Sequence, residues 1–142
     1  MEQDYHVPVL LDSSIEHLNL GDGSGTWMDA TFGGGGHSRT ILKNLNSEGI
    51  LVSFDQDPDA VKNTINDDRF TLVKANFRYA KQFLSLNGVK KTKGILADLG
   101  VSSHQFDTAD RGFSLRMDGP LDMRMNHESG ISAADYLSDC TW

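Results

Sequence analysis

The stretch DATFGGGGHS, from Asp29 to Ser38, places four consecutive glycines between two segments of different periodicity. The residues TWMDATF (26–32) are rich in β-branched and aromatic side chains, which predicts a strand. The residues HSRTILKNL (37–45) carry their apolar side chains at helical spacing, which predicts a helix. Glycine at a strand-to-helix junction removes Cβ atoms and permits positive φ, so a ligand can lie against the main chain there.

The same alternation of strand and helix continues as far as Gly100. The segment ILVSFD is a nearly continuous apolar run, as expected of a strand that is covered on both faces. Asp57 and Pro58 have the positions of an N-cap and a first helical residue. We expect further strands at 50–55, 70–75 and 94–100, and further helices at 13–20, 57–65 and 78–86. This order predicts an α/β fold with a Rossmann-like half-sheet of about four parallel strands.

The pattern changes after Val101, where no sustained period of 2 or 3.6 is present as far as Gly130. This segment contains many phenylalanine, leucine and methionine side chains, so we expect a packed functional loop and not a disordered linker. A short helix is predicted after Ser132, which has the position of an N-cap with Asp135 three residues later. The chain stops soon after this helix begins, and we therefore expect a partial protein.

The 142-residue chain has a formal net charge of −7, which argues against a protein that coats nucleic acid by bulk electrostatic attraction. A local group of cations stands out nevertheless. We interpret this group as a solvated charged face, and a local surface that reads RNA is the alternative. Its members are Lys74, Arg78, Lys81, Lys90, Lys91 and Lys93.

Two features bear on the compartment of the protein. No apolar run approaches the roughly 20 residues that a membrane helix needs, so we expect no membrane association. Cys140 is the single cysteine, which excludes an internal disulfide and predicts a reducing, cytoplasmic compartment.

Candidate binding residues follow three of the predicted strands. Asp55 ends the second strand, where an acid in this architecture accepts hydrogen bonds from a ribose diol. Phe77 follows the third strand, where its ring could lie against an adenine, and a core position is an equal alternative. Asp98 ends the fourth strand, beside the place of a transferred group. These residues predict an adenosine-containing cofactor, for which NAD(H) and S-adenosylmethionine both qualify, and no metal site is predicted.

Five longer motifs extend beyond these single residues: HVPVLL, DATFGGGGHSRTIL, FDQDPDA, ILADLGVSSHQFDTADRGFSLRMDGPLDMRMN and SAADYL. In these motifs the sequence resembles the bacterial MraW family of ribosomal RNA small subunit methyltransferases, from Tyr5 to about Leu137. The resemblance implies the class I S-adenosylmethionine-dependent methyltransferase fold. It also implies methylation of the exocyclic amino group of a cytidine in the decoding region of 16S rRNA.

The resemblance also implies roles for individual residues. Asp29 matches an acid that orders the glycine loop, and no catalytic residue is assigned, although Asp98 is the nearest candidate for a proton acceptor. One departure is His104, which stands where the family usually has proline. The residues that the resemblance implies as cofactor contacts are Gly35, Gly36, His37, Asp55, Phe77, Asp98 and Gln105.

Members of this family are longer than the present chain and carry a helical domain inserted after the fourth strand. The resemblance therefore implies that residues 1–126 are part of the S-adenosylmethionine-binding Rossmann-like domain and that residues 127–142 begin the inserted helical domain. The implied partners are 16S rRNA and the small ribosomal subunit, and a homodimer is left open.

Two alternatives to this function stay open. One is a fragment that binds the cofactor without turnover. The other, less favoured because no spaced glycine fingerprint is present, is an NAD-dependent Rossmann oxidoreductase.

Overall fold

The computed structural model describes residues 8–140. The chain divides into two compact units, Met1–Asp98 and Leu99–Trp142, and each is described by itself. The boundary that we predicted between residues 126 and 127 stays a prediction.

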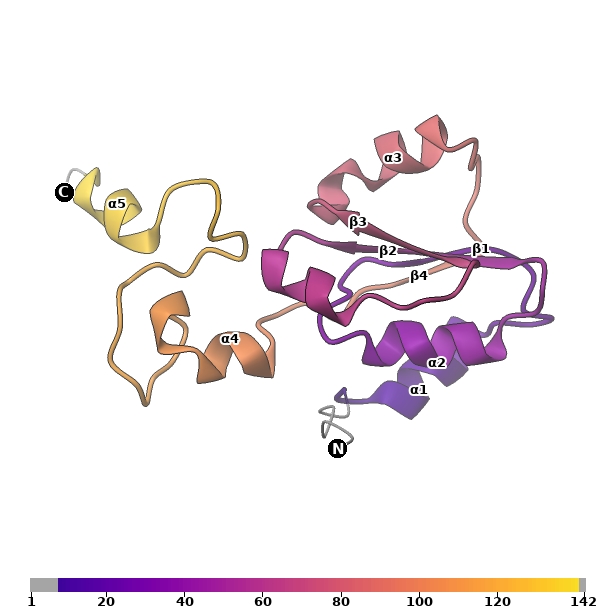
Figure 1. Cartoon of the computed structure of the whole chain (residues 1–142), viewed down its shortest axis with the longest axis horizontal. Coiled ribbons are helices and arrows are strands. Elements are labelled where there is room, and N and C mark those ends of the chain that lie inside the picture. Colours follow the sequence, from indigo (N-terminus) through magenta and orange to yellow (C-terminus); the bar gives the residue numbers. More distant parts are fainter. Residues whose placement is uncertain (1–7, 141–142) are drawn as a thin grey trace. The chain divides into compact units, whose positions relative to one another are not determined.

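The first unit contains a four-stranded parallel sheet in the order β3-β2-β1-β4. This arrangement confirms the predicted α/β fold with a Rossmann-like half-sheet (Figure 1). In chain order, its elements are α1 (Leu11–Leu18), β1 (Gly25–Asp29), α2 (Gly36–Asn44), β2 (Gly49–Asp55), the 3₁₀ helix η1 (Pro58–Asn63), β3 (Phe70–Lys74), the 3₁₀ helix η2 (Phe77–Tyr79), α3 (Ala80–Leu86) and β4 (Gly94–Leu96).

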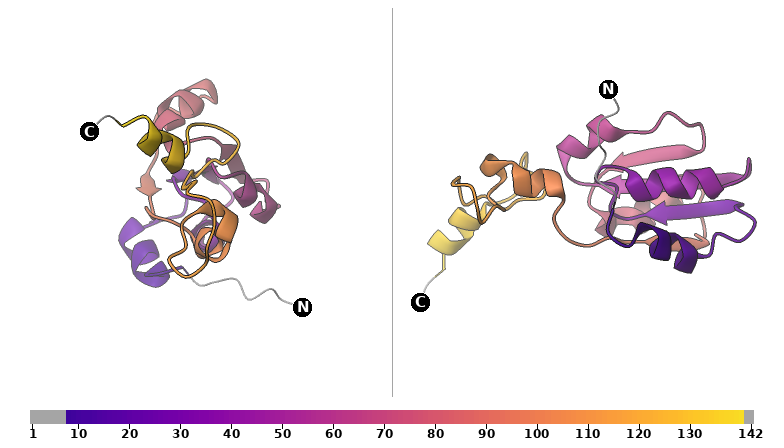
Figure 2. Two further views of the ribbon diagram at one scale, coloured as in Figure 1. Left: turned by 90° about the vertical axis from the view of Figure 1, so that its left-hand side faces the viewer. Right: turned by 90° about the horizontal axis from the view of Figure 1, so that it is seen from below.

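Helices cover both faces of this sheet, α1 and α2 on one face and α3 on the other (Figures 1 and 2). Successive residues of β2 alternate between the two sides, because strand side chains point to opposite faces with a period of two. Leu51 lies in the core beneath α1 and α2, whereas Phe54 lies in the core beneath α3. Both side chains are fully buried. The apolar run in β2 is therefore the consequence of a strand with a core on each side.

Two elements differ from their predicted form. The segment after Asp57 is a 3₁₀ helix and not an α-helix, and in this helix Ala60 is buried whereas Val61 is 43% exposed. The predicted N-cap is confirmed, since the Asp57 side chain accepts a hydrogen bond from the Asp59 N–H. Strand β4 ends at Leu96 and not at Gly100, because its ladder with β1 extends only over the residues paired with Trp27 to Asp29.

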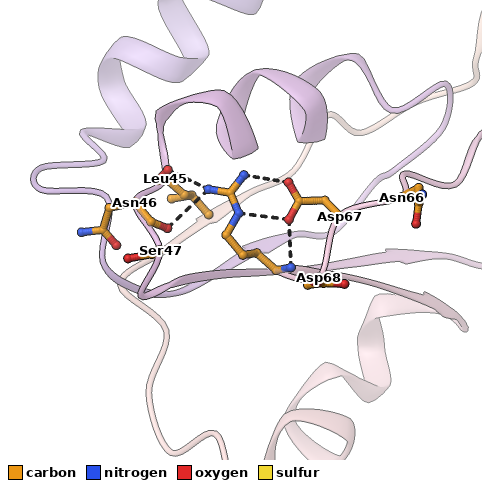
Figure 3. A pocket seen from close by; sticks show the side chains of 7 residues that line it. Leu45, Asn46, Ser47, Asn66, Asp67 and Asp68 are labelled. Atoms are coloured by element: carbon orange, nitrogen blue, oxygen red, sulfur yellow. Dashed lines mark hydrogen bonds and ion pairs between the residues drawn. The ribbon is translucent and has the colours of Figure 1, made fainter.

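An open depression of about 700 Å³ lies at the amino edge of the sheet. Arg69 is one of its lining residues, and the Arg69 guanidinium donates to both carboxylate oxygens of Asp67 and to the Leu45 carbonyl (Figure 3). The Arg69 guanidinium lowers the pKa of Asp67 to about 2. Arg69 thus joins the end of α2 to the turn before β3, and we assign it a structural role. The lining residues are Leu45, Asn46, Ser47, Asn66, Asp67, Asp68 and Arg69.

The second unit contains α4 (Ser103–Asp107), the 3₁₀ helix η3 (Ala109–Arg111) and α5 (Ala133–Ser138). Ser132 caps α5 in a reciprocal capping box with Asp135, as predicted. The buried Arg111 guanidinium donates to the carbonyls of Arg124 and Met125 at 3.1 and 2.9 Å, which fixes the loop between the helices. The loop is held by hydrogen bonds and not by an apolar core, because no leucine, phenylalanine or methionine side chain between residues 99 and 140 is buried. The expectation that its apolar side chains pack together is therefore not confirmed. Over residues 8–140, no helix is both long enough and apolar enough to cross a membrane.

Replacement of Phe54 by alanine tests the core beneath α3. We expect Phe54→Ala to lower the free energy of unfolding by about 3–5 kcal/mol, because a fully buried ring is lost and a cavity remains. Urea unfolding followed by circular dichroism measures this change. Leu86→Ala on α3 is the control, because Leu86 is 85% exposed and its loss should change stability by no more than about 0.5 kcal/mol. Equal effects of the two substitutions would contradict the described packing.

Candidate functional site

The glycine-rich turn connects β1 to α2 at the carboxyl edge of the sheet (Figure 1). Gly35, the residue before α2, has a φ of +80°, and a Cβ there would lie 3.0 Å from the Phe32 ring. A Cβ at Gly36 would collide with the ring of Pro8. No side chain caps α2, so the first N–H groups of this nine-residue helix are available to a ligand. The glycines therefore permit a tight turn and the close approach of the Phe32 and Pro8 rings, while the helix start keeps uncapped N–H groups.

Asp29, at the end of β1, fixes this turn through hydrogen bonds to its carboxylate. Its carboxylate accepts a hydrogen bond from the Thr31 N–H at 3.0 Å and another from the Ser38 hydroxyl at 2.6 Å. The Ser38 hydroxyl also bonds the Ser53 hydroxyl of β2 at 2.8 Å. The side chains of Asp29, Ser38 and Ser53 are completely buried. This polar network joins β1, α2 and β2, as expected of an acid that orders the glycine loop.

Asp55, at the end of β2, also fixes the turn through its carboxylate. One carboxylate oxygen accepts a hydrogen bond from the Gly33 N–H at 2.7 Å, and the other accepts one from the Asp57 N–H at 2.9 Å. Burial raises the pKa of Asp55, although these backbone hydrogen bonds oppose the effect. Each carboxylate oxygen can accept more than one hydrogen bond, so Asp55 retains capacity for a pair of hydroxyl donors.

His37 and Asp98 lie close to each other at the same edge. The His37 side chain is buried, and its Nδ1 lies 3.9 Å from a carboxylate oxygen of Asp98. Its Nε2 is buried without a hydrogen-bond partner among the described residues, an arrangement that calls for a ligand or another explanation. The Asp98 N–H donates to the Thr31 hydroxyl at 2.7 Å, while the Asp98 side chain is 56% exposed. Asp98 therefore has a fixed main chain and an available carboxylate.

Phe77 begins η2, just beyond β3, and is 43% exposed. The Asn76 side chain caps this 3₁₀ helix and donates to the Gln56 side chain at 2.9 Å, which connects η2 to the residue after Asp55. Phe77 is thus only partly buried, and it is accessible from solvent.

Gln105 lies in the second unit and is buried there. Its side-chain oxygen accepts a hydrogen bond from the Ser102 N–H at 2.9 Å, and its main-chain N–H donates to the Ser102 hydroxyl at 3.2 Å. The Gln105 amide also approaches the Met125 sulfur at 3.4 Å. Six of the seven implied residues therefore lie in the first unit, Gln105 lies in the second, and the cofactor contacts of all seven stay a prediction.

Sequence reasoning did not single out Ser38, Ser53 or Thr31. One signal was available, because Ser53 is a polar residue in the middle of the apolar run ILVSFD. A buried polar side chain needs a hydrogen-bond partner, so the position of Ser53 in this run indicates a polar contact with a helix that covers the strand. The partner itself, Ser38, becomes evident only in the folded chain.

A parallel α/β half-sheet, with uncapped N–H groups after its glycine-rich turn and an acid at the end of its second strand, places the chain in the Rossmann-like class. The MraW methylase family model matches residues 3–141. The chain belongs to this family, which confirms the resemblance found in the sequence motifs.

Several curated relatives carry the name ribosomal RNA small subunit methyltransferase H. The chain is 56% identical over 137 residues to that of Phocaeicola vulgatus, with 96% of the chain and 45% of the relative covered. It is 57% identical over 136 residues to that of Cytophaga hutchinsonii, with 94% and 45% covered. It is 53% identical over 136 residues to that of Christiangramia forsetii, with 96% and 45% covered. The chain thus spans about 45% of the length of these relatives.

The buried Asp29 gives the stability of the chain a testable pH dependence. Burial raises the pKa of Asp29 in spite of its hydrogen bonds to Ser38 and Thr31. The stability that this group contributes is full below its unfolded pKa of about 3.9 and is lost as pH rises through the raised native pKa. We therefore expect the stability of Asp29→Asn, relative to the unsubstituted chain, to rise as the pH increases above about 4, as measured by urea unfolding.

Asp29→Ala is the matched control. It is also uncharged, so it should follow the same pH trend, but it leaves the Ser38 hydroxyl and Thr31 N–H without their acceptor. Its stability should therefore lie about 1–3 kcal/mol below that of Asp29→Asn at every pH. If the stability of both variants relative to the unsubstituted chain were independent of pH, Asp29 would not be a buried carboxylate with a raised pKa.

Proposed function

We propose that this chain binds S-adenosylmethionine at the carboxyl edge of its sheet and belongs to a cytoplasmic enzyme that methylates small-subunit ribosomal RNA. The proposed target is the exocyclic amino group of a cytidine in the decoding region of 16S rRNA. The names of the relatives support the RNA class, since they are ribosomal RNA small subunit methyltransferases. Because the chain spans about 45% of their length, the activity of a whole protein is part of the proposal.

The observation that carries this proposal is the carboxylate of Asp55, fixed by the Gly33 N–H beside the uncapped start of α2. A ribose diol can donate two hydrogen bonds to such a carboxylate, which is a charge-assisted contact. The N–H groups at the start of α2 have no side-chain cap, and the His37 Nε2 in the first turn of this helix has no hydrogen-bond partner among residues 8–140. The exposed ring of Phe77 can cover an adenine. These residues fit an adenosine-containing cofactor, and Gln105 is proposed to complete its contacts.

S-adenosylmethionine supplies an electrophilic methyl group on a sulfonium when bound. The chain contributes alignment of the two reactants, which can lower the activation free energy by about 7–11 kcal/mol in principle. The Asp98 carboxylate is available to accept an N–H hydrogen bond and to orient an amino group. A carboxylate placed against the sulfonium would stabilise the ground state more than the transition state, so Asp98 should contact amino groups instead.

A second candidate, for these 142 residues taken alone, is cofactor binding without turnover, because they span about 45% of the length of the relatives. Calorimetric titration with S-adenosylmethionine, combined with transfer of a labelled methyl group to small-subunit RNA, separates the two. Binding with transfer supports the methyltransferase proposal for this chain, and binding without transfer supports the second candidate. Absence of binding would contradict both. The homodimer stays a prediction.

Substitution of Asp55 tests the carboxylate at the centre of the site. We expect Asp55→Asn to weaken S-adenosylmethionine binding about 10- to 100-fold, because hydrogen bonds to a charged acceptor are replaced by weaker ones. Calorimetry measures the affinity. Asp68→Asn is the matched control, since it removes the same charge from an exposed residue at the amino edge and should leave the affinity unchanged. An Asp55→Asn variant that binds as tightly as the control would refute the proposed site.

Substitution of Asp98 tests which part of the cofactor its carboxylate contacts. S-adenosylhomocysteine retains the amino groups of S-adenosylmethionine but has a neutral sulfur. We expect Asp98→Asn to weaken binding of the two compounds by the same factor, because the proposed contact is to amino groups. Calorimetric titration with each compound gives the comparison. A loss confined to S-adenosylmethionine would show that the carboxylate contacts the sulfonium, and no loss with either compound would show that Asp98 does not contact the cofactor.

A further inference from the structure

The charges of this chain are segregated along its sequence. The segment from Phe70 to Ala97 contains six of the 13 lysine and arginine residues and none of the 20 acids. The formal net charge of −7 therefore conceals a purely cationic segment within an acidic chain. Such asymmetry is typical of a local surface for a polyanion.

The cations of this segment include two groups at opposite ends of α3. Arg78 and Lys81 lie at the start of the helix, where the chain arrives from the carboxyl end of β3 (Figure 1). Lys90 and Lys91 lie beyond the end of the helix, in the connection to β4. Because α3 has seven residues, it separates the groups by about 10 Å. Only the first group is next to the candidate site.

The first group is exposed and combines charge with an aromatic ring. Arg78 and Lys81 are exposed, and neither forms an ion pair with any residue between 8 and 140. The Arg78 guanidinium lies 5.3 Å from the centroid of the Tyr79 ring, and Tyr79 is 46% exposed. We call these three residues, Arg78, Tyr79 and Lys81, the η2–α3 face. An exposed ring among cations is the composition of surfaces that bind single-stranded nucleic acid.

The register of the sheet places this face beside the candidate site. Lys74, the last residue of β3, is the direct partner of Asp55 in the parallel ladder. Neighbouring strands are about 4.8 Å apart, so the segment that leads into η2 starts one strand away from Asp55. The Asn76 side chain adds a second connection through its hydrogen bond to Gln56. A polyanion on the η2–α3 face therefore lies at the same edge as the bound cofactor.

We propose that the η2–α3 face is a docking surface for single-stranded RNA, on which Arg78 and Lys81 hold phosphates and Tyr79 stacks on a base. The inference rests on the proposed function, because it identifies where the RNA substrate meets the edge that holds the cofactor. Single-stranded RNA fits better than a duplex, since stacking on Tyr79 needs an unpaired base. The local cations provide the attraction that the acidic remainder of the chain opposes.

The test compares two double variants that remove equal charge from the same segment. Binding of a fluorescently labelled 12-nucleotide single-stranded RNA to the 142-residue chain is followed by anisotropy between about 50 and 200 mM salt. We expect Arg78→Gln with Lys81→Gln to reduce the slope of log affinity against log salt by about 1.4, because each phosphate that no longer meets a cation reduces it by about 0.7. Lys90→Gln with Lys91→Gln is the matched control and should leave the slope unchanged. Tyr79→Leu should lower the affinity at least about fivefold without changing the slope.

Each alternative gives a different result. Equal losses in the two double variants would overturn the proposal in favour of bulk charge, and unchanged binding in Arg78→Gln with Lys81→Gln would overturn it outright. Binding to phosphatidylserine vesicles that this variant loses, while its RNA binding is retained, would identify a lipid surface instead. Calorimetry with S-adenosylmethionine on the same proteins separates the two proposals. Retained cofactor binding with no RNA effect overturns only the docking surface, and the expected RNA pattern without cofactor binding overturns only the proposed function.

Discussion

The buried carboxylate of Asp29 is the contact on which the carboxyl edge of this sheet depends. A turn made of glycines has no side chains of its own with which to fix its path. Asp29 supplies that restraint from the strand below, through the Thr31 N–H and the Ser38 hydroxyl. Its burial raises the pKa, so the arrangement costs stability near neutral pH.

A second carboxylate completes the restraint and faces outward. Asp55 accepts the Gly33 N–H, so the turn is held at two points by acids from neighbouring strands. The two acids differ in burial, since Asp29 is completely enclosed whereas Asp55 is only partly covered. Asp29 therefore has no capacity to meet a ligand, and Asp55 does. One restrains the glycines, and the other both restrains them and remains available as an acceptor.

The order of strands and helices was predictable because segments of strand composition alternate with segments whose apolar side chains recur at helical spacing. The N-caps Asp57 and Ser132 were also predictable, since capping depends on residues that are close in sequence. Other features depend on contacts between distant segments. The 3₁₀ form of η1 and the early end of β4 belong to this group, because tertiary packing and ladder length decide them. The Ser38–Ser53 contact joins residues 15 apart, which no local pattern specifies.

The sheet register relates charge to position at the carboxyl edge. Asp55 and Lys74 are direct partners on neighbouring strands, so the last acid of β2 stands beside the first cation of the acid-free segment. An acceptor for sugar hydroxyls and a surface for phosphates require opposite charges. The cations proposed to meet phosphates, Arg78 and Lys81, lie beyond the end of β3 and not at the strand position that pairs with Asp55, so the two charges belong to separate positions at the same edge. The parallel topology makes this possible, because it brings the carboxyl ends of all four strands to one side of the sheet.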